Sequence, residues 1–406
     1  MHATFAALMA ALTLAGSAAA KSYYTERLED PKAVYLTPDR FPVRADGVAD
    51  DSAALQQAID RVEETTRTGI VFIPEGVYRL GRTVCVWPGV RLIGYGARRP
   101  VLLLGANTPG FQDGAGKYML YFAGGRPRAA GQPVRDGNPG TFYSAASNID
   151  IEIRDGNPAA VAVRFHVAQH CYLAHMDFRI GSARAALEDI GNEGEDLHFF
   201  GGEYGIVTTK TAPSWPYLLI DSTFEGQRAA AIKSREAGLT LVRNRFKSVP
   251  AAVAIDEGYA EELWLKDCLF DNIAGPAIVF GNENNPRTQI NAEDVVCRRV
   301  HVFAAMRETG KRVAGPAQMY TVTRFSHGLH LDGGGAGQID TRFDARPISE
   351  MPAMAPSDIP GLPPGADWVN VRALGAAGDG STDDTAALKS AIAAHRRCIY
   401  RWGAIA

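Results

Sequence analysis

The sequence Leu239-Thr-Leu-Val-Arg-Asn-Arg-Phe246 decides the fold, because close variants of it recur along the chain. Two of the variants are Tyr217-Leu-Leu-Ile-Asp-Ser-Thr-Phe224 and Leu263-Trp-Leu-Lys-Asp-Cys-Leu-Phe270. Each copy has a Leu five residues before its final Phe, and each is followed by a short run of small apolar residues such as Ala252-Val-Ala-Ile255. The period is about 20 to 26 residues and contains no helical pattern. Such a period is typical of a solenoid.

The short strands of this period predict an all-β, parallel β-helix. A single coil cannot bury its own apolar face, so coils stack about 4.8 Å apart and equivalent side chains form ladders. We therefore expect Leu219, Leu241 and Leu265 to stack in consecutive coils of the core. A leucine-rich-repeat horseshoe has a similar period, but it requires an Asn/Cys-centred consensus and a helical return segment, and the repeat has neither.

A second, longer phrase occurs twice. Arg44-Ala-Asp-Gly-Val-Ala-Asp-Asp-Ser-Ala-Ala-Leu55 returns as Ala377-Gly-Asp-Gly-Ser-Thr-Asp-Asp-Thr-Ala-Ala-Leu388. Asp-Gly predicts a tight turn, and Asp-Asp-Ser/Thr offers oxygens to the free N–H groups of a helix start. Leu55, Ile59 and Val62 then form one apolar stripe. The phrase therefore predicts an N-terminal helix that caps the first coil, and its return predicts that a second β-helix begins.

These patterns divide the chain into four segments. Residues 1–20 contain an apolar run and a small-residue cleavage site, typical of a signal peptide, so we expect a secreted or periplasmic protein. Residues 21–344 are predicted to form the first β-helix domain, and 345–368 a Pro-rich linker. Residues 369–406 are predicted to be the truncated start of a second β-helix domain.

The composition narrows the class of partner. Charged residues make up 21% of the 406 residues and the net charge is -3, which favours neither a nucleic acid nor a membrane as partner. The five cysteines have no CxxC spacing, and no nucleotide-binding motif is present, so we expect no metal and no cofactor. Buried thiols are expected, with a Cys268–Cys297 disulfide as the alternative. The oligomeric state is left open.

Polar clusters follow the small apolar strands, and they are expected to form a column along one edge of the solenoid. A glycosidase needs two carboxyl groups on either side of the scissile bond. We therefore predict catalytic roles for three acidic residues in these clusters: Asp256, Glu257 and Glu283. The predicted substrate-binding residues are Lys233, Arg235, Asn282, Trp264 and Tyr259. The alternative is a solvated edge whose opposite charges balance, with Trp264 under a covering loop.

The segment from Pro42 to Gly96 resembles the N-terminal signature of the pectate-lyase-superfamily (rhamnogalacturonase/epimerase-like) proteins, which implies a right-handed parallel β-helix. The two cap phrases joined by a Pro-rich linker resemble the tandem β-helix exo-β-1,3-glucanases of glycoside hydrolase family 55. In that family the active site lies between two β-helices, and the second supplies the catalytic acid. Here the pattern is lost after Ala394, in His395-Arg-Arg-Cys-Ile-Tyr-Arg-Trp-Gly-Ala-Ile-Ala406.

The resemblance implies a glycoside hydrolase of the β-1,3-glucanase type acting on a polysaccharide, or the N-terminal half of one. Because the second β-helix is expected to be incomplete, we expect this chain to be a poor catalyst. Two alternatives stay open: a non-catalytic polysaccharide-binding β-helix and a polyuronide (pectate) lyase.

Overall fold

The computed structural model describes residues 22–30, 32–114, 116–129, 131–211, 215–331, 337–359, 369–395 and 398–399. The predicted signal peptide and part of the predicted linker lie outside these residues. The chain divides into two compact units, residues 1–355 and 356–406. In the described part of the chain, no helix has the length and apolar character needed to cross a membrane.

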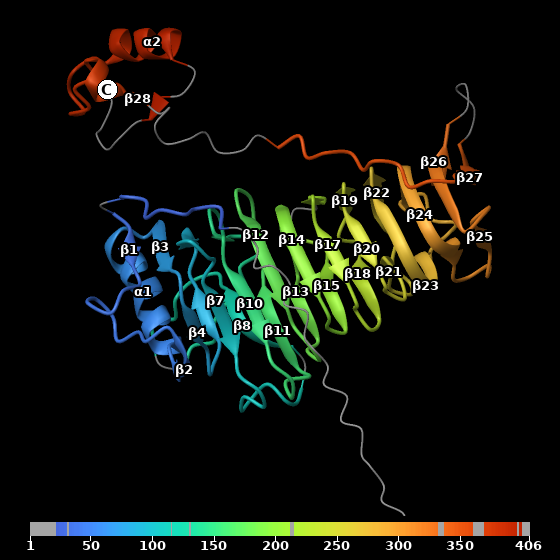
Figure 1. Cartoon of the computed structure of the whole chain (residues 1–406), viewed down its shortest axis with the longest axis horizontal. Helices are drawn as coiled ribbons and strands as arrows, with labels where there is room; N and C mark the ends of the chain where they lie inside the picture. The colour runs from blue at the N-terminus through green and yellow to red at the C-terminus, as the bar shows by residue number, and fades with distance from the viewer. Residues whose placement is uncertain are drawn as a thin grey trace, which may run out of the picture. The chain divides into compact units, whose positions relative to one another are not determined.

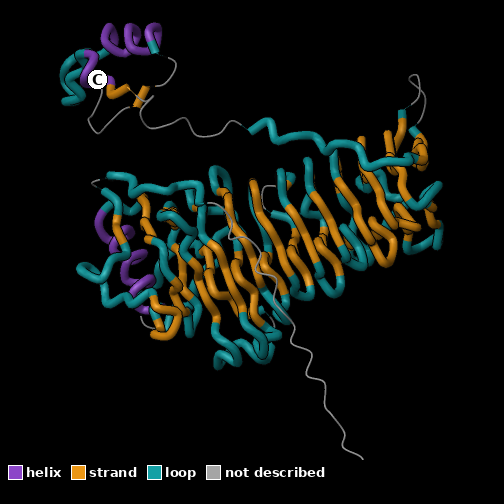
Figure 2. The backbone as a smooth tube through the Cα atoms, in the orientation of Figure 1, coloured by secondary structure: helices purple, strands orange, loops and turns teal. Residues whose placement is uncertain are grey.

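The first unit is the predicted parallel β-helix, of about 10 turns. Each coil contributes one strand to each of three faces, and the strands within a face are parallel. Figures 1 and 2 show the strands of successive coils side by side along the unit. The first face contains β1 (Val34–Tyr35), β3 (Gly69–Pro74), β6 (Val90–Tyr95), β9 (Ala145–Ser147), the first parts of β12 (Tyr172–Arg179) and β14 (Glu193–Phe200), β16 (Tyr217–Ile220), β19 (Leu239–Val242), β22 (Glu262–Lys266) and the first part of β24 (Gln289–Met306).

The other two faces are built in the same way. The second contains β2 (Asp46–Asp50), β4 (Val77–Arg79), β7 (Val101–Leu104), β10 (Asp150–Ile153), the second parts of β12 and β14, β17 (Thr223–Glu225), β20 (Arg245–Lys247), the start of β23 (Leu269–Phe280) and the middle of β24. The third contains β5 (Val84–Val86), β8 (Lys117–Phe122), β11 (Ala160–Arg164), β13 (Ala185–Glu188), β15 (Tyr204–Thr209), β18 (Ala230–Arg235), β21 (Val253–Ile255) and the ends of β23 and β24.

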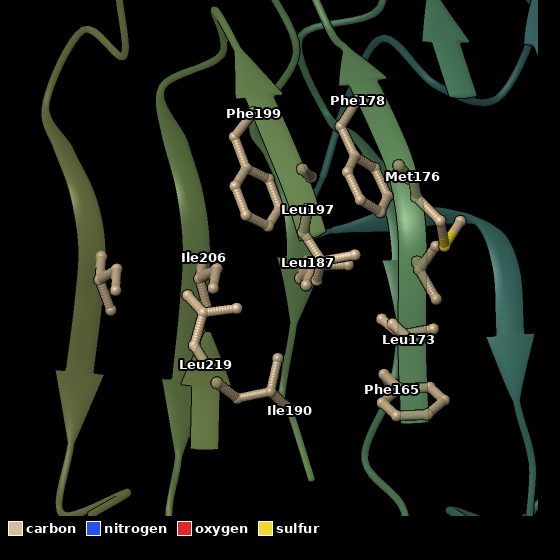
Figure 3. Packing of buried hydrophobic residues seen from close by; sticks show 14 of the residues in the cluster. Phe165, Leu173, Met176, Phe178, Leu187, Ile190, Leu197, Phe199, Ile206 and Leu219 are labelled. Atoms are coloured by element: carbon tan, nitrogen blue, oxygen red, sulfur yellow. The ribbon is translucent and has the colours of Figure 1, made fainter. Parts of the chain in front are cut away.

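The core consists of ladders, as the repeat predicts. Leu219 pairs in register with Leu241, and Leu241 with Leu265, and all three are fully buried. A parallel ladder of phenylalanines runs beside them. Figure 3 shows two of its members, Phe178 and Phe199, whose ring centroids are 5.1 Å apart. The predicted stacking is confirmed.

Left-handed backbone conformations mark the corner between the first and second faces. One residue per coil has a φ between +51° and +55° there: His175, Asp196, Asp221, Arg243, Asp267 and Asp294. Asp, Asn and His tolerate this conformation better than other non-glycine residues. The recurrence of Asp at these positions therefore has a backbone cause, and it aligns charged side chains along the corner.

The helix α1 (Ser52–Thr65) lies at the β1 end of the solenoid (Figure 1) and buries Leu55, Ile59 and Val62 completely. The predicted capping helix is confirmed, but its capping chemistry differs from the prediction. Asp50 accepts the Ser52 N–H at 2.9 Å, whereas the buried Asp51 carboxylate turns back and accepts the N–H groups of residues 44 and 45, at 2.7 and 3.0 Å.

The far end of the first unit departs from the parallel pattern. Here β24 pairs antiparallel with β25 (Arg312–Ala314) and β26 (Met319–His330), and β26 pairs antiparallel with β27 (Gln338–Pro347). Cys268 and Cys297 are free thiols, so the alternative of a disulfide between them is wrong.

The second unit repeats the start of the first. It contains β28 (Val369–Asn370), a 3-10 helix (Val371–Leu374), α2 (Thr385–Ala394) and β29 (Cys398–Ile399), which pairs parallel with β28. Asp384 accepts the N–H groups of residues 377 and 378 at 2.7 and 2.8 Å, as Asp51 does with residues 44 and 45. The repeated phrase is therefore a repeated structure.

Candidate functional site

A charged groove lies on the outer surface of the third face. Along β15 and β18 the side chains alternate, so Ile206 and Ile232 enter the core while Val207 and Lys233 point outward. The groove has a volume of about 170 Å³. The residues that line it are Arg184, Glu188, Asp189, Val207, Thr208, Thr209, Lys233 and Arg235, and we call it the charged groove.

Two carboxylates are held together in the charged groove by Arg164 of the preceding coil. One guanidinium nitrogen, Nη1, lies 2.5 Å from Oδ2 of Asp189 and 3.7 Å from Oε1 of Glu188. The separation of the two oxygens cannot exceed the sum of these two distances, which admits the roughly 5 Å between the carboxyl groups of retaining glycosidases. The side chains of Glu188 and Asp189 are 15% and 14% exposed, so both reach solvent.

Hydroxyl groups complete the surroundings of these carboxylates. Tyr118 donates its hydroxyl to Oε1 of Glu188 at 2.6 Å, and Thr209 donates to Oδ1 of Asp189 at 2.8 Å. Burial raises the pKa of Tyr118, and its hydrogen bond to Glu188 adds to this effect. Tyr118 therefore keeps its proton at neutral pH and donates a hydrogen bond to Glu188.

The structure brings three of the sequence-predicted residues together. Lys233 and Arg235 line the charged groove, and both form ion pairs with Asp256, at 3.5 and 2.5 Å. Glu257 follows Asp256 in an exposed turn. The ring of Tyr259, in the same turn, lies 5.6 Å from the guanidinium carbon of Arg235.

Glu283 occupies a different environment from the one expected. It is 3% exposed, and its carboxylate accepts the N–H groups of Glu308 and Thr309, at 2.9 and 3.3 Å. The expectation that Asp256, Glu257 and Glu283 crowd one open groove is therefore wrong for Glu283, whose contacts stabilise a turn. The catalytic roles of the three residues stay predictions.

Two further predicted residues lie outside the charged groove. Asn282 donates to the carbonyl of Gly258 at 2.8 Å and so ties together the turns of two coils. Trp264 points outward from the first face, opposite in parity to Leu265, as the sequence indicates. It is 38% exposed and pairs in register with Thr240 and Asn291.

The sequence reasoning missed Arg164 and Tyr118 as members of the site. Glu188 and Asp189 follow a small apolar strand, as the other polar clusters do, so a local signal for them exists. Arg164 has no such signal, because it reaches Glu188 only through the pairing of β11 with β13.

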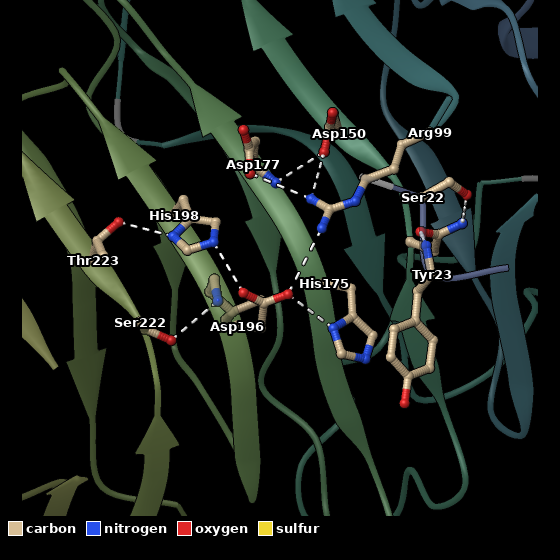
Figure 4. A network of polar contacts seen from close by, with 12 residues as sticks. Ser22, Tyr23, Arg99, Asp150, His175, Asp177, Asp196, His198, Ser222 and Thr223 are labelled. Atoms are coloured by element: carbon tan, nitrogen blue, oxygen red, sulfur yellow. Dashed lines mark hydrogen bonds and ion pairs between the residues drawn. The ribbon is translucent and has the colours of Figure 1, made fainter. Parts of the chain in front are cut away.

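A second polar cluster lies at the corner between the first and second faces (Figure 4). Arg99 is almost buried and forms ion pairs with Asp150, Asp177 and Asp196, at 3.2, 3.3 and 3.7 Å. Figure 4 also shows His175, which binds Asp196 at 2.9 Å. These ion pairs and hydrogen bonds link residues of neighbouring coils, although Nε of Arg99 has no hydrogen-bond partner among the described residues.

Asp196 is the centre of this cluster. Burial disfavours its charged form, but hydrogen bonds from His175 and His198, both at 2.9 Å, outweigh burial and hold its pKa well below the usual value. The ring of Tyr23 stacks on His175 with centroids 3.8 Å apart, which fastens the N-terminal segment to the solenoid.

A curated relative matches most of this chain at low sequence identity. Among curated proteins this chain is similar to a non-secreted LysM effector, LysM19, of Penicillium expansum, with 22% identity over 439 residues. The match covers 92% of this chain and 32% of that protein, so the chain spans about a third of the length of this relative.

Two solved structures show the degree of structural likeness. The family 28 exopolygalacturonase of Yersinia enterocolitica is 12% identical with a TM-score of 0.45, over 68% of this chain and 61% of that one. The surface adhesin PfbA of Streptococcus pneumoniae is 11% identical with a TM-score of 0.41, over 76% of this chain and 98% of that one. Residues 39–278, more than half of the chain, match the family described as rhamnogalacturonase A/epimerase, pectate lyase-like. The chain therefore belongs to the rhamnogalacturonase A/epimerase family of pectate-lyase-like proteins.

Proposed function

We propose that this protein is a glycoside hydrolase that acts on a polysaccharide in the charged groove. Both proposed carboxyl groups lie on the first unit, so this proposal, unlike the expectation of a poor catalyst, does not require a second β-helix. The observation that carries the proposal is the pair of carboxylates, Glu188 and Asp189, held by one guanidinium nitrogen of Arg164 in an open groove. Membership of a family named after a polysaccharide hydrolase and an epimerase supports it. Because residues 1–20 have the pattern of an export signal, we also propose that the protein acts outside the cytoplasm.

The two carboxyl groups have different surroundings, which suits them to different roles. Asp189 has the closer ion pair with Arg164, so we assign it the charged role of nucleophile or base. Glu188 has longer ion pairs, at 3.7 Å to Arg164 and 3.4 Å to Arg184, so it loses less ion-pair stabilisation on protonation than Asp189 does. The Tyr118 hydroxyl, 2.6 Å away, can donate to the carboxylate of Glu188 or accept from its protonated form. We assign it the role of the acid that protonates the leaving oxygen.

The resemblance of the two cap phrases to tandem β-1,3-glucanases makes β-1,3-glucan the first substrate to test. A polyuronide lyase is the second candidate, because Arg184, Lys233 and Arg235 gather in the charged groove and would bind uronate carboxylates. Polysaccharide binding without catalysis is the third.

Reducing-sugar release from laminarin by the wild type and by Glu188→Gln tests the proposal. General acid catalysis contributes about 10²–10⁴-fold, so the variant should lose about a hundredfold or more in kcat/KM. Glu152→Gln is the matched control, because Glu152 lies on the second face in an exposed ion pair with Arg154. It should keep wild-type activity, and thermal unfolding checks that both variants are folded.

The same assay separates the alternatives. An unsaturated, ultraviolet-absorbing product from pectate selects the lyase. Binding of laminarin without turnover selects the binding protein. Wild-type turnover that Glu188→Gln leaves unchanged would show that the reaction takes place elsewhere on the molecule.

A further inference from the structure

A second, larger groove follows the corner between the third and first faces of the solenoid. Its volume is about 1000 Å³. Three of its lining residues are large and exposed: Phe142 at 38%, Tyr143 at 51% and Trp215 at 50%. We call it the aromatic groove. Exposed clusters of apolar side chains often mark binding surfaces.

The aromatic side chains of this groove come from three of four successive coils. Tyr143 precedes β9, His170 precedes β12, and Trp215 precedes β16, with the coil of β14 between the last two. Because these strands pair in the order β9, β12, β14, β16, the aromatic groups follow one another along the long axis at the coil spacing of about 4.8 Å per coil. A linear polymer parallel to that axis would meet all of them.

The backbone at this groove takes a left-handed conformation. Tyr143 and His170 both have a φ of +61°. Arg67 and Asn192, which precede β3 and β14, have φ values of +60° and +57°, so the conformation is a recurring feature of this corner of the coil. Here the conformation places the two rings parallel, with an interplanar angle of 6° and centroids 5.0 Å apart, so that Tyr143 is presented to solvent on a rigid support.

The charges of this groove differ from those of the charged groove. Among its described lining residues there is no Asp, Glu, Lys or Arg, and its polar groups are neutral ones such as the amides of Gln169 and Asn192. Aromatic faces carry negative charge density, which attracts the polarised C–H groups on the face of a pyranose ring. Lys210 and Arg287 lie in a smaller pocket that shares Trp215 and also contains three glutamates. Along the rest of the aromatic groove the lining offers no Lys or Arg to the carboxylates of a polyuronide, whereas a neutral sugar requires none.

We propose that the aromatic groove binds an uncharged polysaccharide chain along the solenoid axis, with Trp215 and Tyr143 as stacking platforms. The inference rests on the proposed function for the ligand being a polysaccharide, and it adds that the sugar is neutral. The groove therefore binds a glucan-like substrate more tightly than a polyuronide.

Calorimetric titration of the full chain with laminarihexaose and with hexagalacturonate tests this inference. The titration uses the Glu188→Gln background, so that hydrolysis does not consume the sugar. We expect laminarihexaose to bind more tightly, with an affinity that changes little with salt because no ion pairs form. Trp215→Ala and Tyr143→Asn should each weaken binding about tenfold or more, as loss of an aromatic anchor does. Asn is chosen at 143 because it tolerates a positive φ.

Val48→Ala is the control, since Val48 is 71% exposed on the second face, and its affinity should equal that of the background. Tighter binding of hexagalacturonate, no binding of either sugar, or unchanged affinity in Trp215→Ala would each overturn the inference. So would a loss of affinity in Trp264→Ala rather than in Trp215→Ala. Because the readout is binding, a failure of the hydrolase proposal leaves this result interpretable: laminarihexaose would still bind, and Trp215 would still be required.

Discussion

Leu241 is the residue on which the register of the core depends most directly. It lies between Leu219 and Leu265 in the ladder and is fully buried. Leu241→Ala removes buried methyl groups and leaves a cavity that the neighbouring coils cannot close. We expect the free energy of unfolding to fall by about 2 to 5 kcal/mol, measured by urea denaturation.

Val48→Ala is a suitable comparison, because an exposed side chain should change the free energy of unfolding by less than about 0.5 kcal/mol. A change of that small size in Leu241→Ala would contradict the ladder.

Asp196 makes stability depend on pH in a predictable direction. Its pKa in the folded protein is lowered, so the charged form stabilises the fold above the unfolded value of about 3.9, and this stabilisation is lost as the pH falls below about 4. Asp196→Asn keeps a residue that tolerates the φ of +52° but removes the titration. Between pH 5 and pH 2 the melting temperature of the wild type should therefore fall more steeply than that of the variant. Parallel profiles would show that Asp196 does not couple folding to protonation.

At the scale of elements, the two copies of the cap phrase offer an internal comparison. In α1 the side chains of Leu55 and Ile59 are fully buried, whereas in α2 Leu388 is only partly buried and Ile392 is 62% exposed. The same local sequence therefore starts two helices with different amounts of packing. Helices derive most of their stability from such packing rather than from intrinsic propensity.

Hydrogen exchange should reveal this difference. Amides in α1 should exchange slowly, through opening of the packed solenoid, while amides in α2 should exchange much faster because few buried apolar contacts oppose local opening. Mass spectrometry of peptides covering residues 52–65 and 385–394 in one sample compares the two directly. Equal protection would mean that α2 is packed as well as α1.

In the first unit as a whole, the charged groove, the aromatic groove and the network around Asp196 lie on different surfaces of one stack. The third face carries the charged groove, the corner between the third and first faces carries the aromatic groove, and the corner between the first and second faces carries the network around Asp196. The residues of each surface occupy equivalent positions in successive coils, because every coil stacks on its two neighbours. A column of similar positions can therefore bind a linear polymer without any one coil forming a complete pocket.

The sequence alone predicts the solenoid, its capping helix and the ladder of Leu219, Leu241 and Leu265. These features follow from the spacing of apolar residues in the sequence. Apolar residues alternate along a half-buried strand, and they recur every three or four residues along one side of a helix. The sequence also predicts that Lys233, Arg235 and Asp256 lie in one column of polar clusters, because each cluster follows a strand of the same face.

The contacts between coils, in contrast, depend on how the chain folds in three dimensions. Arg164 reaches Glu188 and Asp189 because β11 and β13 pair in one register, and a shift of one residue would turn these side chains to the other face. Glu283 becomes buried because the turn after β24 closes over it, in a region where antiparallel strands replace the repeat. Trp215 lines the aromatic groove from a corner between two strands, and the sequence repeat does not extend to this corner. Contacts of these kinds depend on loop lengths and strand register, which no local pattern of residues encodes.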